Sequence, residues 1–197
     1  MLKLLIKSLA LLTLLITSTL VSANNYELKC DFKFDDMLKM SPRNFDQDFE
    51  KGWVQVADKE GCKEASANLI SLYYTVRDLP APVTQTLKFH EAQLRAELGQ
   101  TQHAISLFKE TLREKNKNGW NYYVLGTIAF LEKDREKLTE AIQSLSNVKK
   151  PEGFNPVDSN GNPIKVEWPP NLDVLQRYNQ CFEKGYLEAY SGCSDTN

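Results

Sequence analysis

A short pattern of small and apolar residues recurs along the chain and limits the folds available to it. In the segment ELGQTQHAISLF, residues 97–108, a glycine is followed by an alanine and then by an aromatic residue, at Gly99, Ala104 and Phe108. Gly61, Ser66 and Ile70 reproduce this spacing 38 residues earlier. A shift of 34 residues toward the C-terminus keeps apolar or small character at further pairs of positions: Phe89 and Tyr123, Ala92 and Gly126, Leu94 and Ile128, Ala104 and Leu138, Phe108 and Ile142. Self-similarity at such a period predicts an array of repeated units.

Helical periodicity indicates what each unit contains. Glycine and proline are sparse between residues 45 and 148, and apolar residues recur there at intervals of three and four with charged residues between them. This spacing is typical of amphipathic helices, and no segment alternates with a period of two for long enough to predict a sheet. Short connections favour antiparallel helix pairs. We therefore expect an all-α fold with three helical hairpins over residues 45–150.

These hairpins resemble the tetratricopeptide repeat, a helix–turn–helix family with a period of 34 residues. The Leu125-Gly126 pair carries the resemblance in one copy, and Gly99, Ala104 and Phe108 carry it in another. The resemblance implies a tetratricopeptide-like α-α superhelix, in which small residues let two paired helices approach closely.

Two of the copies depart from the family pattern. In the first copy Val54 replaces the small residue of the first helix, and Ser66 replaces the alanine of the second. In the third copy Lys133 replaces the turn glycine and Leu138 the alanine. A turn three residues longer would instead place Ala141 at the alanine position, so the register of that helix stays open. A generic helical bundle is the alternative to the repeat array.

The resemblance also implies a binding surface, because the first helix of each pair lines the concave face in this family. The groove positions then fall on Lys51, Gln55, Phe89, Gln93, Trp120, Tyr123 and Thr127. An aromatic floor with lysine and amide neighbours suits an extended or helical peptide. The alternative is that a C-terminal helix with its own tyrosines covers Trp120 and Tyr123 and leaves them in the core.

The N-terminus reads as a targeting segment. Residues 1–23 combine Lys3 and Lys7, an apolar stretch and the small residues of Val21-Ser22-Ala23, which is the pattern of a cleaved secretory signal peptide. The apolar stretch is too short for a transmembrane anchor. Loss of the two lysines moves the formal charge from −2 to −4. Nucleic acid and anionic membranes need concentrated positive charge, so we expect neither as a partner and no stable membrane insertion.

The cysteines support export, to the periplasm first and the cell exterior second. All four cysteines follow the signal peptide, and an even number in an oxidising compartment predicts disulfides. Of three pairings we favour Cys30–Cys62 and Cys181–Cys193, because each joins near neighbours at one end of the chain. A zinc site is disfavoured, since the sequence has no C-x-x-C pair and its two histidines are distant from the cysteines.

The segments that flank the hairpins read as caps, which repeat arrays need at both ends. Residues 24–44 form an N-terminal cap segment. Residues 151–170, rich in proline and glycine, form an ordered loop or small hairpin. Residues 171–197 form one C-terminal capping helix, with Asn171 as its N-cap, Gly192 as its stop and a disulfide-closed tail.

Catalytic chemistry has little support in the sequence. His90 and His103 lie near Glu91 and Glu97 and give the best available acid–base or metal cluster, but a metal site needs a further ligand at defined spacing. No motif of a hydrolase, metalloprotease, phosphate-binding loop or dinucleotide site is present. The segment DSNGN places its glycine wrongly for a calcium loop and reads as a turn. We therefore expect no catalytic residues, no metal and no cofactor.

These observations lead to a non-enzymatic periplasmic scaffold or adaptor that binds another protein or peptide through its concave face. A narrower alternative is an immunity protein that neutralises a toxin delivered to the periplasm. A cell-wall-active enzyme built on the two histidines, and a domain that acts by self-association, are further alternatives.

Overall fold

The structure is a computed structural model that describes residues 30–48, 50–116, 118–157 and 161–193. The signal-peptide prediction falls on residues 1–23 and lies outside the described residues. The described residues are predominantly helical, which confirms the all-α prediction, and their one extended pairing is an isolated antiparallel bridge between Val157 and Pro163. The chain divides into two compact units, Met1–Asp78 and Leu79–Asn197, called unit 1 and unit 2 below.

Unit 1 contains the short helices α2 (Phe34–Lys39) and α3 (Gly52–Ala57), a π-helical turn at Arg43–Gln47, and the longer helix α4 (Lys63–Val76). Its core forms where the Phe45 and Tyr73 rings stack with centroids 3.8 Å apart. The Tyr73 hydroxyl donates to the carbonyl of Met40 at 2.7 Å, which satisfies the buried phenol. Gly52 begins α3 with φ +62°, and its missing side chain leaves room for the backbone of Phe45. Residues 45–57 therefore hold only a short first helix in the first predicted hairpin.

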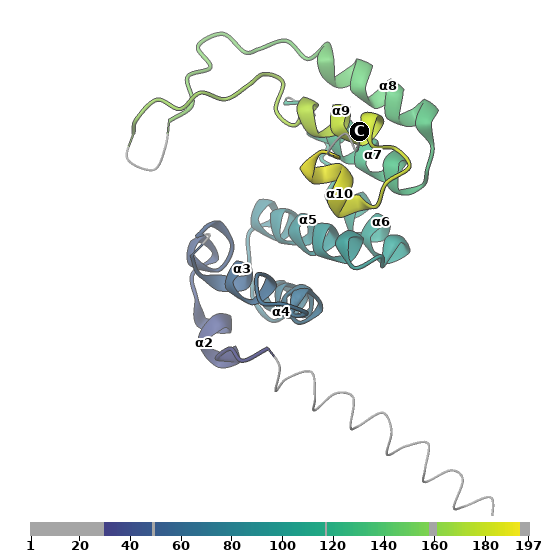
Figure 1. Cartoon of the computed structure of the whole chain (residues 1–197). Coiled ribbons are helices and arrows are strands. Elements are labelled where there is room, and N and C mark those ends of the chain that lie inside the picture. Colours follow the sequence, from purple (N-terminus) through teal and green to yellow (C-terminus); the bar gives the residue numbers. More distant parts are fainter. Residues whose placement is uncertain (1–29, 49, 117, 158–160, 194–197) are drawn as a thin grey trace, which may run out of the picture. The chain divides into compact units, whose positions relative to one another are not determined.

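Unit 2 contains two long helix pairs and two shorter C-terminal helices (Figure 1). The pairs are α5 (Ala81–Glu97) with α6 (Thr101–Glu110), and α7 (Trp120–Leu131) with α8 (Arg135–Ser146). The C-terminal helices are α9 (Leu172–Gln180) and α10 (Tyr186–Ser191). Helix α7 packs on both α6 and α8, α9 packs on α7 and α8, and α10 packs on α9 and α5.

The turns inside the two long pairs are equivalent, although their sequences differ. Gly99 has φ +74°, and Lys133 adopts φ +58° at the corresponding position. The next residue closes each turn in the same way, because the Gln100 N–H donates to the Arg95 carbonyl and the Asp134 N–H to the Ala129 carbonyl, both at 2.8 Å. These bonds form a Schellman-type helix end, in which a left-handed residue satisfies the last carbonyls.

The equivalent turns settle the register that the sequence left open in the third copy. The Ala104 N–H donates to the Gln100 carbonyl at 3.0 Å, and the Leu138 N–H donates to the Asp134 carbonyl at 3.1 Å. Leu138, which is fully buried, therefore takes the alanine position, and the longer turn that would have brought Ala141 there does not occur. Lys133 tolerates a left-handed conformation that costs a residue with a side chain about 1–2 kcal/mol.

Gly126 is where helices come closest in unit 2. A Cβ atom at this position would lie 2.7 Å from both Leu175 methyl carbons and 3.1 Å from the Cβ of Ala141. Contacts this short are repulsive, since carbon atoms pack at about 3.5–4.0 Å. Glycine therefore lets α9 and α8 approach α7, and the small residue predicted at this position has a packing role.

The C-terminal segment differs from the single capping helix that we predicted. Helix α9 ends at Gln180, and α10 begins only at Tyr186, after Gly185. A continuous helix would separate residues 181 and 193 by about 18 Å, at 1.5 Å per residue. The Cys181–Cys193 disulfide instead holds their Cα atoms 5.8 Å apart, so the chain must fold back between them.

The caps of this segment match the sequence in position. Gly192 ends α10 with φ +87°, as predicted. Asn171 directly precedes α9, but its side chain makes no capping hydrogen bond and its backbone is left-handed. The predicted packing of this segment on the last hairpin is confirmed, although two helices share it.

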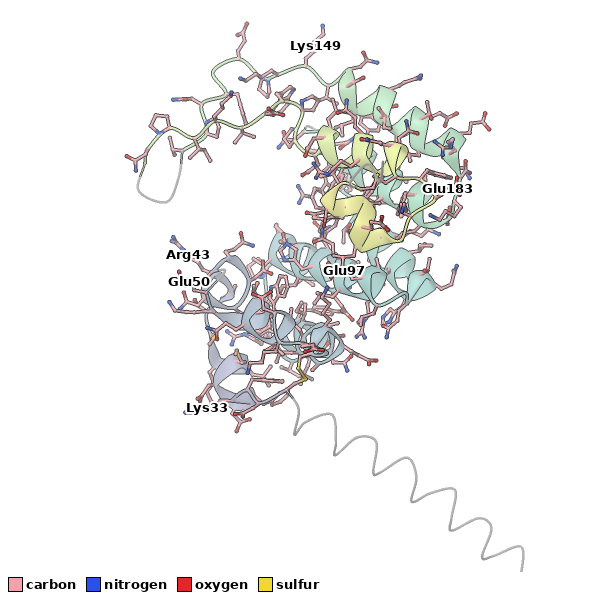
Figure 2. The ribbon with its side chains drawn as sticks, in the orientation of Figure 1. Lys33, Arg43, Glu50, Glu97, Lys149 and Glu183 are labelled. Carbon is pink, nitrogen blue, oxygen red and sulfur yellow. A yellow bond between two sulfur atoms is a disulfide. The ribbon has the colours of Figure 1, made fainter. Side chains whose placement is uncertain are left out.

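Both predicted disulfides are present. Cys30–Cys62 connects the start of the described chain to the residue before α4, and Cys181–Cys193 closes the C-terminal segment. The loop predicted between α8 and α9 extends away from the helices as an arm (Figure 1). The Phe154 and Trp168 rings pack edge to face at its base, and the Trp168 indole donates to the Val148 carbonyl at 2.8 Å. Figure 2 shows Lys149 where the arm begins.

Candidate functional site

The predicted groove residues of unit 1 are exposed. Lys51 directly precedes α3, and its ammonium pairs with the carboxylate of Asp48 at 2.9 Å. The hydrogen bond to Asp48 raises the pKa of Lys51, and its counterpart lowers the pKa of Asp48. Gln55 lies on α3 and is also exposed. Both side chains are therefore accessible, as a contact surface requires.

The predicted groove residues of unit 2 gather into an aromatic cluster. The Phe89 ring on α5 lies 4.8 Å from the Trp120 ring and 5.6 Å from the Tyr123 ring, both on α7. Phe89 and Tyr123 are only 5% and 3% exposed. Thr127 is fully buried, and its hydroxyl donates to the Tyr123 carbonyl one helical turn earlier. These three side chains belong to the core of unit 2.

Trp120 and Gln93 are only half-buried and lie at the edge of this cluster. The Trp120 indole donates to the Thr111 carbonyl at 2.8 Å, and the Arg113 guanidinium lies 4.4 Å from the centre of its ring. Both contacts fix the indole within the α6–α7 connection. Trp120 is thus held in place by its own unit and keeps part of its surface exposed.

The C-terminal helices provide the cover over the cluster. Tyr178 on α9 stacks on Phe130 of α7 with centroids 4.6 Å apart, and Tyr186 on α10 lies 5.8 Å from Tyr178. Burial, with the nearby phenols of α10 as a second cause, raises the pKa of the Tyr123 phenol well above its usual value. The alternative in which the C-terminal segment covers these positions is therefore the arrangement found, and Phe89, Tyr123 and Thr127 do not form an open wall.

The histidines do not form a catalytic pair in the described contacts. The imidazole of His103 lies 4.0 Å from a carboxylate oxygen of Glu91, while His90 packs against the Phe89 ring. Glu91 is fully buried, and the Arg95 guanidinium donates to its carboxylate at 2.9 and 3.1 Å. A buried carboxylate in this geometry is held as an ion-pair partner. Over the described ranges, no group of three or more histidine, cysteine, aspartate or glutamate side chains is suited to hold a metal ion.

An open groove that the sequence did not indicate runs along α6, α7 and α8. It encloses about 370 Å³. Its lining comprises Lys109, Tyr122, Leu125, Ile128, Ala129, Glu132, Lys137, Glu140, Ala141 and Ser144. We call it the α6–α7–α8 groove.

The α6–α7–α8 groove has an apolar floor and charged edges. Ile128, Ala129 and Ala141 are buried at its base, whereas Leu125 is 46% exposed. At one edge the Lys109 ammonium lies 3.7 Å from the Glu132 carboxylate, so cationic and anionic groups alternate along the rim. An exposed leucine above an apolar floor, with a polar rim, is the anatomy of a small contact surface for another protein.

Helix α7 carried a signal for this groove. No charged residue occurs between Trp120 and Leu131. A helix that is apolar around its whole circumference either is buried on every side or presents apolar surface. The face of Tyr123 is covered by α9 and α10, and the opposite face, with Leu125, is the one left open.

The chain matches no protein-family model, no curated protein and no solved structure. None of the helices in the described ranges has the length and hydropathy needed to cross a membrane. The function must therefore be argued from the geometry of the site.

Proposed function

We propose that the protein is a non-enzymatic adaptor that binds a segment of another protein. The observation that carries the proposal is the α6–α7–α8 groove, where Leu125 is 46% exposed above the buried side chains of Ile128 and Ala141. Burial of exposed apolar surface contributes about 25 cal/mol per Å², so an apolar side chain inserted beside Leu125 would be a favourable anchor. Charged groups of both signs on the rim would set the orientation of the bound segment.

The proposal includes a tetratricopeptide-like arrangement of the hairpins. Its support is the identical hydrogen-bond pattern at the Gly99 and Lys133 turns, together with the close approach of helices at Gly126. A repeated helical hairpin offers a rigid, extended surface on which exposed residues are held by a packed core. Such scaffolds suit recognition better than chemistry, because recognition needs only fixed surface groups.

We further propose that the adaptor acts in the periplasm. The two disulfides support an oxidising compartment, since such bonds persist there and are rare in the cytosol. The immunity-protein hypothesis is a special case in which the captured partner is a toxin. Identification of the captured protein separates the two roles.

The test is a capture experiment with two matched variants of the full exported chain. Leu125 and Leu187 are 46% and 47% exposed, and both lie on helices of unit 2. A lysine at either position should cost little stability, but only Leu125→Lys places a charge in the α6–α7–α8 groove. We expect wild type and Leu187→Lys to capture the same protein from envelope extracts and Leu125→Lys to lose it. Capture that is unchanged in Leu125→Lys, or absent with wild type, would count against the proposal.

A further inference from the structure

We propose a second binding surface in unit 2, distinct from the α6–α7–α8 groove, that α10 occupies within the same chain. The surface consists of the buried aromatic cluster and the residues around it on α5, α7 and α9. A helical segment of a partner protein, with aromatic side chains four residues apart and one hydrogen-bond acceptor, would bind there after α10 moves away. The inference goes beyond the open groove and does not depend on it.

Helix α10 has the features of a replaceable insert. It is six residues long, which is too short to be stable as an isolated helix in water. Only one side of it is buried, where Tyr186 and Ala189 are 5% and 0% exposed, while Leu187 on the other side is 47% exposed. Tyr186 and Tyr190, four residues apart, stack at 5.9 Å and bring two rings to Tyr178. Helix α10 therefore inserts aromatic groups into the cluster as a bound peptide would.

The contact below α10 is imperfect in its hydrogen bonding. The hydroxyls of Tyr178 and Tyr186 approach each other, and the amide of Gln93 approaches Tyr186. Neither hydroxyl makes a hydrogen bond of acceptable geometry within the described part of the chain, although both are buried. A buried polar group without a partner is unfavourable. A partner helix that places a carboxylate or amide oxygen at the Tyr178 hydroxyl would satisfy a group that α10 leaves without one.

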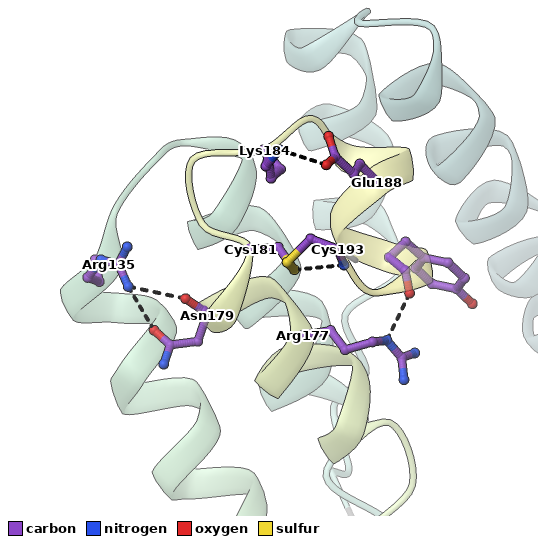
Figure 3. Close-up of a disulfide and its surroundings, with 8 residues drawn as sticks. Arg135, Arg177, Asn179, Cys181, Lys184, Glu188 and Cys193 are labelled. Carbon is purple, nitrogen blue, oxygen red and sulfur yellow. Dashed lines mark hydrogen bonds and ion pairs between the residues drawn. A yellow bond between two sulfur atoms is a disulfide. The ribbon is translucent and has the colours of Figure 1, made fainter. Parts of the chain in front are cut away.

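The chain holds the base of α10 more firmly than α10 itself (Figure 3). The Cys181–Cys193 disulfide joins the residues on either side of the α10 loop. The Lys133 ammonium donates to the carbonyls of Phe182 at 2.6 Å and Lys184 at 3.0 Å, which fixes the start of the loop to the α7–α8 turn. The Arg177 guanidinium donates to the Tyr190 carbonyl at 2.9 Å near its end. The loop can therefore open while both of its ends stay attached, and the disulfide limits how far it opens.

The first experiment measures opening in the unaltered protein. Hydrogen exchange followed by mass spectrometry on the full exported chain should find amides of α10 at least ~tenfold less protected than those of α7, because local opening needs no global unfolding. Protection of α10 equal to that of α7 would overturn the inference. This arm needs no variant and decides the matter even if a variant does not fold.

The second experiment measures binding of a defined probe, a fluorescein-labelled peptide of the chain's own residues 183–192, EKGYLEAYSG. The protein variants form a matched pair: Cys181→Ser/Cys193→Ser removes the disulfide that limits α10, and Cys30→Ser/Cys62→Ser removes the one in unit 1. Apparent affinity scales with the fraction of molecules whose site is free, so we expect at least ~tenfold tighter binding to the first variant than to wild type and no change with the second. A peptide with both tyrosines replaced by alanine should not bind.

The outcomes separate this inference from the proposed function. Equal binding of the peptide to wild type and to Cys181→Ser/Cys193→Ser would overturn the inference and leave the α6–α7–α8 groove untouched. Loss of partner capture in Leu125→Lys with unchanged peptide binding would assign the two surfaces to different ligands, as the inference requires.

Discussion

The substitution Gly126→Ala tests the packing of unit 2 most sharply. The added methyl group would lie 2.7 Å from both Leu175 methyl carbons, and Leu175 is fully buried. Overpacking of this kind costs about 1–3 kcal/mol, whereas alanine gains about 1 kcal/mol over glycine in a helix. We therefore expect a net loss of about 1 kcal/mol in the free energy of unfolding of unit 2. An exposed helical glycine would show the opposite sign.

A double-mutant cycle shows whether the loss comes from this contact. Leu175→Ala alone should cost about 2–5 kcal/mol, because it opens a cavity beneath α9. In the Gly126→Ala background the new methyl group fills part of that cavity, so the cost of Leu175→Ala should fall by at least about 1 kcal/mol.

The assay is urea unfolding followed by tryptophan fluorescence in a Trp53→Phe background. Trp53 is the tryptophan of unit 1, and Trp120 and Trp168 then report on unit 2 alone. Stabilisation by Gly126→Ala, or strictly additive effects of the two substitutions, would refute the close approach of α7 and α9.

Further predictions concern the disulfides and the buried phenols. Loss of Cys30–Cys62, with a sequence separation of 32, should destabilise unit 1 by about 4 kcal/mol, and loss of Cys181–Cys193, with a separation of 12, should destabilise unit 2 by about 3 kcal/mol in the loop-entropy model; equal unfolding midpoints with and without reductant would contradict this. Tyr186→Phe removes a buried hydroxyl that has no hydrogen bond of acceptable geometry within the described residues, so the free energy of unfolding should stay the same or rise by about 1 kcal/mol, and a loss above about 2 kcal/mol would show that the hydroxyl is satisfied. Burial raises the pKa of Tyr186, so the folded state favours the neutral phenol. Its contribution to stability is complete below the unfolded pKa of about 10 and is lost as pH rises through the higher folded value. Unfolding at several pH values should therefore give a smaller alkaline loss for Tyr186→Phe than for wild type, and identical slopes would contradict this.

The helical fold and the disulfides were predictable because each rests on a local signal. Apolar residues at intervals of three and four identify the paired helices, and short sequence separations favoured the two cysteine pairs that the structure contains. The register of the third copy was not decidable from sequence, since Lys133 carries none of the glycine preference for a left-handed turn. There the surrounding helices determine the backbone conformation.

The C-terminal segment shows how two predictions can conflict. A stripe of apolar residues from Leu175 to Tyr190 favours one helix, whereas a bond between Cys181 and Cys193 requires the chain to reverse. The covalent bond prevails, and Gly185 marks the start of the second helix. A distance check along the expected helix would have exposed the conflict from the sequence alone.

The candidate site was the least predictable part. Aromatic residues such as Phe89 and Tyr123 suit a contact surface and a core equally well, and only the position of α9 and α10 decides between them. Leu125 was identified as part of a packing pattern, yet it lies on the exposed side of an uncharged helix. Which face of such a helix stays open depends on tertiary packing that no local pattern encodes.

Site-specific photo-crosslinking in living cells tests the central claim most directly. A benzophenone amino acid placed at Leu125 lies in the α6–α7–α8 groove, and one placed at Leu187 lies on a surface of similar exposure outside it. The account predicts one discrete protein adduct from position 125 and none of that mass from position 187. Absence of an adduct at 125, or the same adduct from both positions, would contradict it.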